Sequence, residues 1–307
     1  MINIIYYQIK NIQYALKINI YKRVTFTANS TRLRRHASAE QKKLIPIGKI
    51  RRAYGMHNKI IQNLRETLLL FGSFPGTECI EENGGVFYCS YIPSAGENYL
   101  LLPPDKANLN ASLLRGIAFF KDRDTPFICP VSIPHDESTI LLLENSGMRE
   151  RARLTGMIRN LKGYETKQEE TPPLLSSSEN PERLANALWR AFDSDDCAPE
   201  QFISFIQGAL STDKVNIYAL QQCGEIAAIT MLTKTQDTAG IYYVATLPAF
   251  RRKGLGQKLM DYVLSDAKTM GYEYACLLAT PAGHPLYLKC GFADVFSSSV
   301  YSYATEL

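Results

Sequence analysis

The sequence predicts a protein of mixed α/β (α+β) class, in which a smaller α/β domain precedes a domain built on a mostly antiparallel sheet flanked by helices. Three observations support this. The chain has 307 residues, 46% of them hydrophobic, which is enough for one large or two ordinary cores. Short apolar runs alternate with segments of helical spacing. A polar stretch at 165–181, with two consecutive prolines and three consecutive serines, has the composition of a linker.

These observations divide the chain into four parts. The expected boundaries are a basic arm at 1–55, the smaller α/β domain at 56–164, the linker at 165–181 and the second domain at 182–307.

The composition excludes several classes of protein. No stretch reaches the roughly 18 consecutive apolar residues of a membrane span, and the first residues lack the apolar core and cleavage site of a signal peptide. The seven cysteines never occur as C-x-x-C, and only four histidines are present. We therefore expect a cytoplasmic protein without disulfides and without a metal site.

Basic residues are concentrated at the start of the chain. Residues 1–52 hold twelve lysines and arginines against one acid, Glu40, so this segment carries +11 and the remainder −7. Such an arm can bind nucleic acid or an anionic membrane surface. No aromatic residues are interleaved with the cluster from Arg32 to Arg35, so neither partner is favoured. A further alternative is that Met56 is the native start, which would make residues 1–55 dispensable.

Local patterns predict the elements of the smaller domain. Between 58 and 71 the apolar residues recur every three or four positions, as on one face of a helix. Apolar runs bounded by proline and glycine predict strands. The expected order is a helix at 58–71, strands at 86–91 and 98–102, a helix at 109–120, extended segments at 127–131 and 139–144, and a closing turn at 145–148.

The second domain shows a clearer series of patterns. Two segments of helical spacing come first, then three apolar runs separated by short polar turns, which predict an antiparallel meander. The expected order is ααβββαβαβ, with helices at 181–192 and 199–210, strands at 215–220, 225–233 and 240–247, a helix at 257–270, a strand at 272–279, a short helix at 285–289 and a strand at 299–303.

The junction between the third strand and the next helix has the features of an anion site. The strand runs into Arg251-x-x-Gly254-x-Gly256 and then directly into the helix, so several backbone N–H groups point at one place. The two glycines remove side chains that would keep a diphosphate from the backbone, and the basic residues strengthen the field. The alternative is an ordinary tight turn with a solvated basic rim. The antiparallel meander argues against a dinucleotide-binding fold, and no Walker lysine follows.

The segments 244–256 and 278–292 resemble the GNAT superfamily of N-acyltransferases, and the likeness in element order extends over roughly 182–303. One shared motif is the R-x-x-G-x-G loop, which in that family wraps the CoA pyrophosphate. The other runs from Thr280 to Phe292 and contains Leu-Tyr followed by Gly-Phe. The resemblance implies acetyl-CoA as cosubstrate, no metal, and CoA contacts from Val244, Ala245, Thr246, Arg251, Arg252, Lys253, Gly254, Leu255, Gly256 and Thr280.

The resemblance also implies a catalytic residue. An amine that attacks a thioester creates an oxyanion, which needs a fixed donor, and releases a thiolate, which needs a proton. In the family the tyrosine of the second motif faces the CoA sulfur, so Tyr287 is expected to be the general acid. The alternative is an aromatic side chain that only packs the short helix. No carboxylate lies on 240–247, and the base stays unassigned between a water chain, Glu225 and His284.

Two function classes follow from these expectations. The favoured one is an N-acetyltransferase that moves an acetyl group from acetyl-CoA to a primary amine. The alternative is a catalytically inactive CoA-binding or interaction module of the same fold. The smaller domain is expected to be a degenerate GNAT-like half that binds no CoA, because it lacks the R-x-x-G-x-G loop. The acceptor is a small molecule or a peptide amine, and neither its identity nor the oligomeric state can be read from the sequence.

Overall fold

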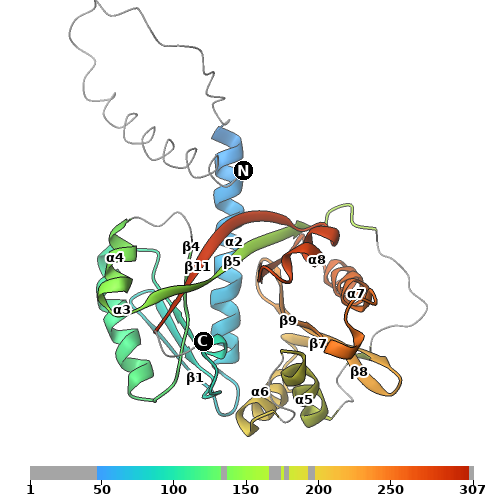
Figure 1. Cartoon of the computed structure of the whole chain (residues 1–307). Helices are drawn as coiled ribbons and strands as arrows, with labels where there is room; N and C mark the ends of the chain where they lie inside the picture. Colours follow the sequence, from blue (N-terminus) through green and yellow to red (C-terminus); the bar gives the residue numbers. More distant parts are fainter. Residues whose placement is uncertain (1–46, 133–136, 166–173, 176–179, 193–197, 304–307) are drawn as a thin grey trace, which may run out of the picture. The chain divides into compact units, whose positions relative to one another are not determined.

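The structure is a computed structural model that describes residues 47–132, 137–165, 174–175, 180–192 and 198–303 (Figure 1). From Arg51 onward the chain forms one compact unit. Residues 1–46 of the expected basic arm lie outside the described residues. Most of the expected linker at 165–181 also lies outside them. No helix among the described residues is long and apolar enough to cross a membrane.

The first part of the chain contains more regular structure than the sequence patterns indicated. A long helix runs without interruption through position 56, and a strand of twelve residues closes the segment. The elements are α2 (Ile47–Phe71), β1 (Glu78–Glu82), β2 (Gly85–Cys89), η1 (Ala95–Glu97), β3 (Tyr99–Leu101), α3 (Lys106–Lys121), β4 (Cys129–Ser132), α4 (Glu137–Asn145) and β5 (Arg149–Asn160).

One expected element in this part is wrong. The apolar run at 139–144 was expected to be extended, but it forms helix α4. Thr139 and Leu143, four residues apart, are both buried, whereas Leu141 between them is 55% exposed. This is helical rather than alternating burial, and a short apolar run does not distinguish the two conformations by itself.

The second part follows the predicted order. Its elements are β6 (Leu174–Leu175), α5 (Pro181–Ala191), α6 (Glu200–Leu210), β7 (Val215–Gln222), β8 (Glu225–Lys234), β9 (Ala239–Thr246), η3 (Pro248–Phe250), α7 (Leu255–Thr269), β10 (Tyr274–Ala279), α8 (His284–Lys289) and β11 (Ala293–Ser302). From α5 onward this is the predicted ααβββαβαβ series, with a short 3-10 turn before α7. The meander β7-β8-β9 is antiparallel, as expected.

The strands of the described residues form two sheets. A three-stranded antiparallel sheet has the order β1-β2-β3, and an eight-stranded sheet has the order β4-β11-β5-β10-β9-β8-β7-β6. The small sheet continues toward β4 through a parallel bridge between Tyr99 and Ile128, where the N–H of Leu100 donates to the carbonyl of Ile128 at 2.9 Å. Together these pairings give the mostly antiparallel, helix-flanked architecture that was predicted.

The two parts of the chain exchange their last strands. From β1 to β5 the order is three antiparallel strands, a helix, a strand, a helix and a strand, and the same order runs from β7 to β11. Strand β5 lies between β10 and β11, while β11 lies between β4 and β5. The long antiparallel pair β5–β11, which is visible in Figure 1, extends from the Arg149–Ser302 pair to the Ile158–Ala293 pair. The exchange makes one continuous sheet from both parts.

The core is divided by this sheet. Along β8, Ile229 and Met231 belong to a cluster with residues of α2, α5 and α6, whereas Ala228 and Leu232 belong to a cluster with residues of α7. This follows from the alternation of side chains along a strand. Helix α2, from the first part, is thereby packed against the strands of the second part. Its buried Asn63 donates to the hydroxyl of Thr238 at 3.0 Å and accepts from the hydroxyl of Tyr242 at 2.7 Å.

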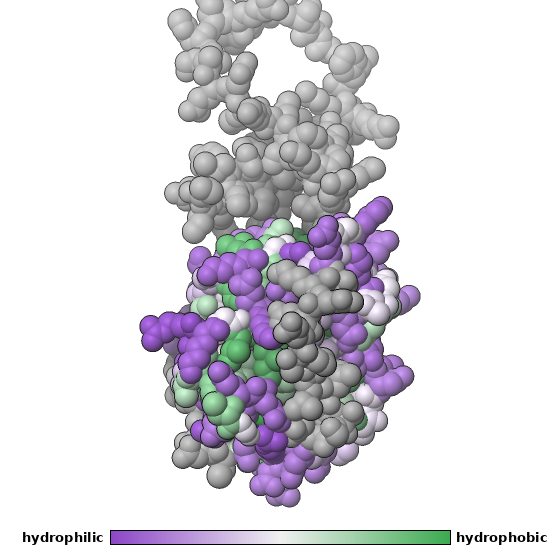
Figure 2. All heavy atoms as spheres, turned by 90° about the vertical axis from the view of Figure 1, so that its right-hand side faces the viewer, coloured by the Kyte–Doolittle hydropathy of each residue, from purple (hydrophilic) through white to green (hydrophobic). Residues whose placement is uncertain are grey.

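The side of the described surface that Figure 2 draws shows no large apolar face. On the side shown in Figure 2, hydrophobic surface is confined to patches between hydrophilic side chains. Among the described residues the exposed large hydrophobic side chains are distributed over several elements, with Leu114 on α3, Leu141 on α4 and Leu288 on α8. Single exposed hydrophobic residues of this kind are ordinary in globular proteins.

Candidate functional site

The sheet is opened between β9 and β10. Among the described residues these parallel strands pair only through Ala239 with Ala275 and Gly240 with Cys276. Beyond Gly240, strand β9 continues to Thr246 and pairs with β8 on its other side. The edge of β9 that faces β10 therefore presents backbone groups that an extended ligand can pair with.

A bulge marks the opening on β9. The register between β8 and β9 shifts between Ile229 and Met231, and Tyr243 in the shifted segment has φ +53°. Such a conformation is unfavourable for a bulky residue that is not glycine, and bulges with strained residues concentrate at functional sites. The ring of Tyr243 is held by aromatic neighbours, Phe202 at 6.1 Å and Phe205 at 5.7 Å between ring centroids.

The loop after β9 leaves the start of α7 open. Gly254 is the N-cap residue with φ +78°, and no side chain caps the helix there. A Cβ added at Gly254 would meet no atom of the described residues within 4 Å, so there is open space beside this residue. The four residues Arg251 to Gly254 are exposed. The uncapped N–H groups and the helix dipole make this junction suited to an anion.

The basic side chains of the loop have different contacts. The guanidinium of Arg251 donates to the carbonyl of Thr246 at 3.1 Å and to that of Ala191, at the end of α5, at 2.8 Å. Arg251 therefore fixes the shape of the loop. Lys253 lies 5.0 Å from the ring centroid of Phe250, and Arg252, with φ +62°, is exposed.

Several predicted site residues converge behind the loop. A Cβ at Gly256 would lie 3.3 Å from Cδ2 of Leu286 and 3.4 Å from Oγ1 of Thr246. The end of β9, the first turn of α7 and helix α8 therefore meet at Gly256. Thr280 is exposed at the end of β10, and its hydroxyl accepts from the N–H of Gly283 at 3.2 Å. Leu255 is half-buried and packs between the two main core clusters.

Tyr287 is a buried residue of α8. Its side chain packs on the first turn of its own helix, because a Cβ at Gly283 would lie 2.9 Å from Cε2 of Tyr287, and its ring lies 6.1 Å from that of Phe292. Burial, and to a smaller degree Cys290, raises the pKa of the phenol. The phenol therefore stays protonated over the physiological range, as an acid must before it acts.

The two side chains considered as bases lie elsewhere. His284 pairs through Nε2 with a carboxylate oxygen of Asp294 at 2.8 Å. Glu225 is exposed at the β7–β8 turn. Among the described residues neither side chain forms a hydrogen bond or ion pair with a residue of β9.

A carboxylate that the sequence did not point to lies at the bulge. The hydroxyl of Tyr243 donates to Oε2 of Glu97 at 2.5 Å, and burial raises the pKa of Glu97 to about 7. Glu97 belongs to η1 in the first part of the chain, 146 positions before Tyr243. Sequence patterns missed it because only the folded chain brings it to β9.

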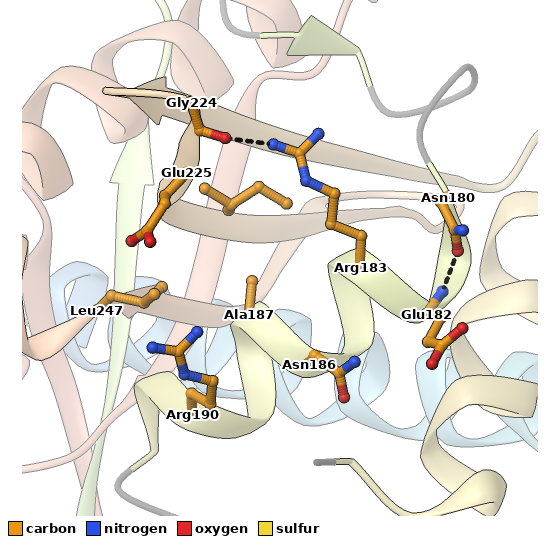
Figure 3. Close-up of a pocket in the computed structure, with 10 residues that line it drawn as sticks. Asn180, Glu182, Arg183, Asn186, Ala187, Arg190, Gly224, Glu225 and Leu247 are labelled. Carbon is orange, nitrogen blue, oxygen red and sulfur yellow. Dashed lines mark hydrogen bonds between the residues drawn. The ribbon is translucent and has the colours of Figure 1, made fainter. Parts of the chain in front are cut away.

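A pocket of about 340 Å³ lies beside the end of β9 (Figure 3). Helix α5 forms one wall, with Arg183 and Arg190, and the β7–β8 turn and Leu247 form the other. Arg183 donates to the carbonyl of Gly224 at 2.8 Å and joins the two walls. Both charge signs line the pocket, since Glu225 also faces it. Among the described residues no group of three metal-ligating side chains is found here or elsewhere.

Comparisons with known proteins agree with this geometry. Residues 182–292 match the model of the acetyltransferase (GNAT) family, and no curated protein matches the chain. A GCN5-related N-acetyltransferase from Kribbella flavida has a similar structure, with a TM-score of 0.59, 16% identity, and coverage of 80% of this chain and 95% of that one. One from Sphaerobacter thermophilus gives a TM-score of 0.50 at 15% identity, covering 74% of this chain and 75% of that one.

A third similar structure is a tandem GNAT protein from the clavulanic acid biosynthesis pathway, with a TM-score of 0.50, 12% identity, and coverage of 82% of this chain and 94% of that one. At these identities the solved structures show the fold alone. The family match identifies residues 182–292 as an acetyltransferase domain of the GNAT family.

Proposed function

We propose that the chain is an N-acetyltransferase that moves an acetyl group from acetyl-CoA to the primary amine of a small molecule or peptide. The observation that carries the proposal is the β9–α7 junction. An exposed, uncapped helix start with a left-handed glycine lies directly after a strand whose other edge is open. An anion joined to an extended chain, such as the pyrophosphate and pantetheine of CoA, fits this combination.

Each part of CoA has a matching part of the site in this proposal. The pyrophosphate accepts hydrogen bonds from backbone N–H groups between Gly254 and Gly256, and the exposed Arg252 and Lys253 add positive charge. The pantetheine pairs with the backbone of Val244, Ala245 and Thr246 along the open edge of β9. Arg251 acts by holding the loop, because its guanidinium is bonded to two backbone carbonyls.

The proposed chemistry is direct attack by the amine. The nitrogen forms a bond to the thioester carbonyl carbon, the C–S bond breaks, and the departing thiolate takes the phenol proton of Tyr287. The buried phenol has the protonation state that this step needs. The proton lost by the amine nitrogen returns the phenol to its starting state.

We further propose that residues 56–164 are a degenerate second copy of the fold. The repeated element order and the exchange of β5 and β11 support this. At the corresponding junction between β3 and α3, the carboxylate of Asp105 accepts from the N–H of Ala107 at 3.1 Å and occupies the place of an anion. This copy therefore binds no CoA.

One observation favours an alternative function. Tyr287 is only 8% exposed and its ring packs against Gly283 and Phe292. A tyrosine that only fills the core would leave a domain that binds CoA without transferring its acetyl group. This alternative makes the chain a CoA-binding module.

Thiol release tests the two functions. The full chain would be mixed with acetyl-CoA and, separately, spermidine, phenethylamine, lysine amide and a short peptide with a free N-terminus, and free CoA would be measured. Amine-dependent release, with acetylated amine identified by mass spectrometry, supports the enzyme. Acetyl-CoA binding without acetylation of any amine in the panel supports the CoA-binding module. A folded chain that binds no acetyl-CoA contradicts both functions.

A further inference from the structure

Glu97 occupies an unusual position for a carboxylate. It ends the short turn η1 in the first part of the chain, and its Oε2 accepts from the hydroxyl of Tyr243 at 2.5 Å. Tyr243 is the strained residue of the β9 bulge, next to Val244, where the proposed CoA thioester would approach. The first part of the chain thus supplies an acidic group to the side chain of the bulge residue in the second.

The turn that carries Glu97 is held rigidly by the next residue. Asn98 is fully buried, and its Oδ1 accepts from the N–H and the hydroxyl of Ser90 at 2.8 and 3.0 Å. Its amide nitrogen donates to the carbonyls of Ile92 and Ser94 at 3.0 and 2.9 Å. These bonds of Asn98 hold the backbone of the turn and thereby fix where the Glu97 side chain starts, as a functional group requires.

The surroundings of Glu97 contain no matching positive charge. Burial is the largest cause of its raised pKa, and the hydrogen bond from Tyr243 opposes it. Among the described residues no lysine, arginine or histidine is bonded or ion-paired to Glu97. Its neighbours are the phenols of Tyr88 on β2 and Tyr99 on β3, whose pKa values are raised by burial and by the charge of Glu97. The hydroxyl of Tyr88 is buried and has no hydrogen-bond partner among the described residues.

These neighbours indicate which chemical group could bind beside Glu97. A buried carboxylate without a cation is costly, and an ammonium group among phenol rings would compensate it through charge and through cation–π contact. Glu97 as a whole residue is half-buried. The phenols of Tyr88, Tyr99 and Tyr243 stay neutral because burial raises their pKa values. Glu97 is the group here that changes charge near neutral pH.

We propose that Glu97 is the proton acceptor for the amine substrate of this acetyltransferase, acting directly or through the hydroxyl of Tyr243. The proposal rests on the proposed function and fills the role that the sequence left unassigned. The amine arrives as an ammonium, one of its protons passes to the Glu97 carboxylate, and the neutral nitrogen attacks the thioester. Glu97 later returns that proton to solvent. In the relay form, Tyr243 gives its proton to Glu97 and takes one from the ammonium.

The test compares Glu97→Gln with wild type in the full chain, using the best amine from the panel. We expect the variant to keep its acetyl-CoA affinity and to lose 10²- to 10⁴-fold in kcat/KM for the amine, which is the usual range for a general base. The wild-type kcat/KM should rise with pH through about 7, where Glu97 loses its proton, and this limb should be absent from the variant. Glu144→Gln, an exposed acid on α4, is the matched control.

A second measurement is independent of turnover. Because the folded-state pKa of Glu97 lies above its ordinary value of 4.5, the folded state binds the proton more tightly than the unfolded state. Its contribution to the free energy of unfolding is fully present below pH 4.5 and is lost as pH rises to about 7. The difference between wild type and Glu97→Gln in urea unfolding should therefore change across this window, and Glu144→Gln should show no such change.

The possible results are distinguishable. A wild type that fails to bind acetyl-CoA overturns the proposed function and this proposal with it. A wild type that binds and turns over, beside a Glu97→Gln variant with the same rate and the same pH limb, overturns only the role of Glu97. Loss of the rate and of the limb with unchanged acetyl-CoA affinity supports it.

Discussion

Two junctions hold the same place in the two parts of the molecule, and they differ in what fills the start of the following helix. At β3–α3, Asp105 caps α3 with its own carboxylate. At β9–α7, Gly254 has no side chain and a φ of +78°, and a Cβ added there would meet no atom of the described residues within 4 Å. The proposed anion site at β9–α7 thus differs from the β3–α3 junction in lacking a side-chain cap at the helix start. The difference predicts a single CoA site, in the second part.

The largest effect on acetyl-CoA binding is expected when a capping aspartate, as at the β3–α3 junction, is introduced at the β9–α7 junction. In Gly254→Asp the new carboxylate would compete with the pyrophosphate for the N–H groups of α7 and repel it, so acetyl-CoA affinity should fall at least about 100-fold. Calorimetric titration measures this. Gly271→Asp, also at a positive-φ glycine with free space but at the other end of α7, controls for backbone strain and should bind normally. Equal affinity in wild type and Gly254→Asp would contradict the assignment of the loop.

The short helices of the two parts offer a second comparison. Four residues before the positive-φ Gly291 lies Tyr287, and four residues before the positive-φ Gly147 lies the fully buried Leu143. Only the second part has a phenol at this place. Tyr287→Phe should lower kcat about 100-fold or more and leave acetyl-CoA affinity nearly unchanged. Steady-state kinetics check this against Tyr54→Phe, an exposed control, and an unchanged kcat would show that Tyr287 only packs.

A smaller effect, on stability, is expected when the capping side chain at the β3–α3 junction is removed. Asp105→Ala removes the side-chain bond to the N–H of Ala107 and should lower the free energy of unfolding by about 0.5–2 kcal/mol. It should not create a CoA site, because no basic loop lies beside it. Urea unfolding and acetyl-CoA titration measure the two effects. Asp122→Ala, at the opposite end of α3, should cost less, since an acid is unfavourable near a helix C-terminus. A second acetyl-CoA bound by Asp105→Ala would contradict the claim that only the β9–α7 junction can bind CoA.

The sequence predicted the second part well because its patterns are local. Helical spacing and polar turns located α5 to β10, and the loop Arg251 to Gly256 stood out by its glycines and charges. The strand β5 was missed because its first five residues are all exposed and mostly charged, without the apolar alternation of a half-buried strand, and β11 was predicted too short. The exchange of β5 and β11 pairs residues far apart in the chain, which no local pattern records.

The site could be predicted only in part for the same reason. The glycines at 254 and 256 were recognisable from their spacing, whereas the contacts of Arg251 with the carbonyls of Thr246 and Ala191 depend on the folded loop. Glu97 has no motif around it. Its position beside Tyr243 results from α2, η1 and the small sheet being packed against the second part.

The most direct test of the account is calorimetric titration of acetyl-CoA into the full-length wild-type chain and into Gly254→Asp. The account predicts one acetyl-CoA bound per wild-type chain and none in the folded variant over the same concentration range. Two molecules per chain, or one that persists in Gly254→Asp, would contradict the claim that the uncapped β9–α7 junction is the CoA site.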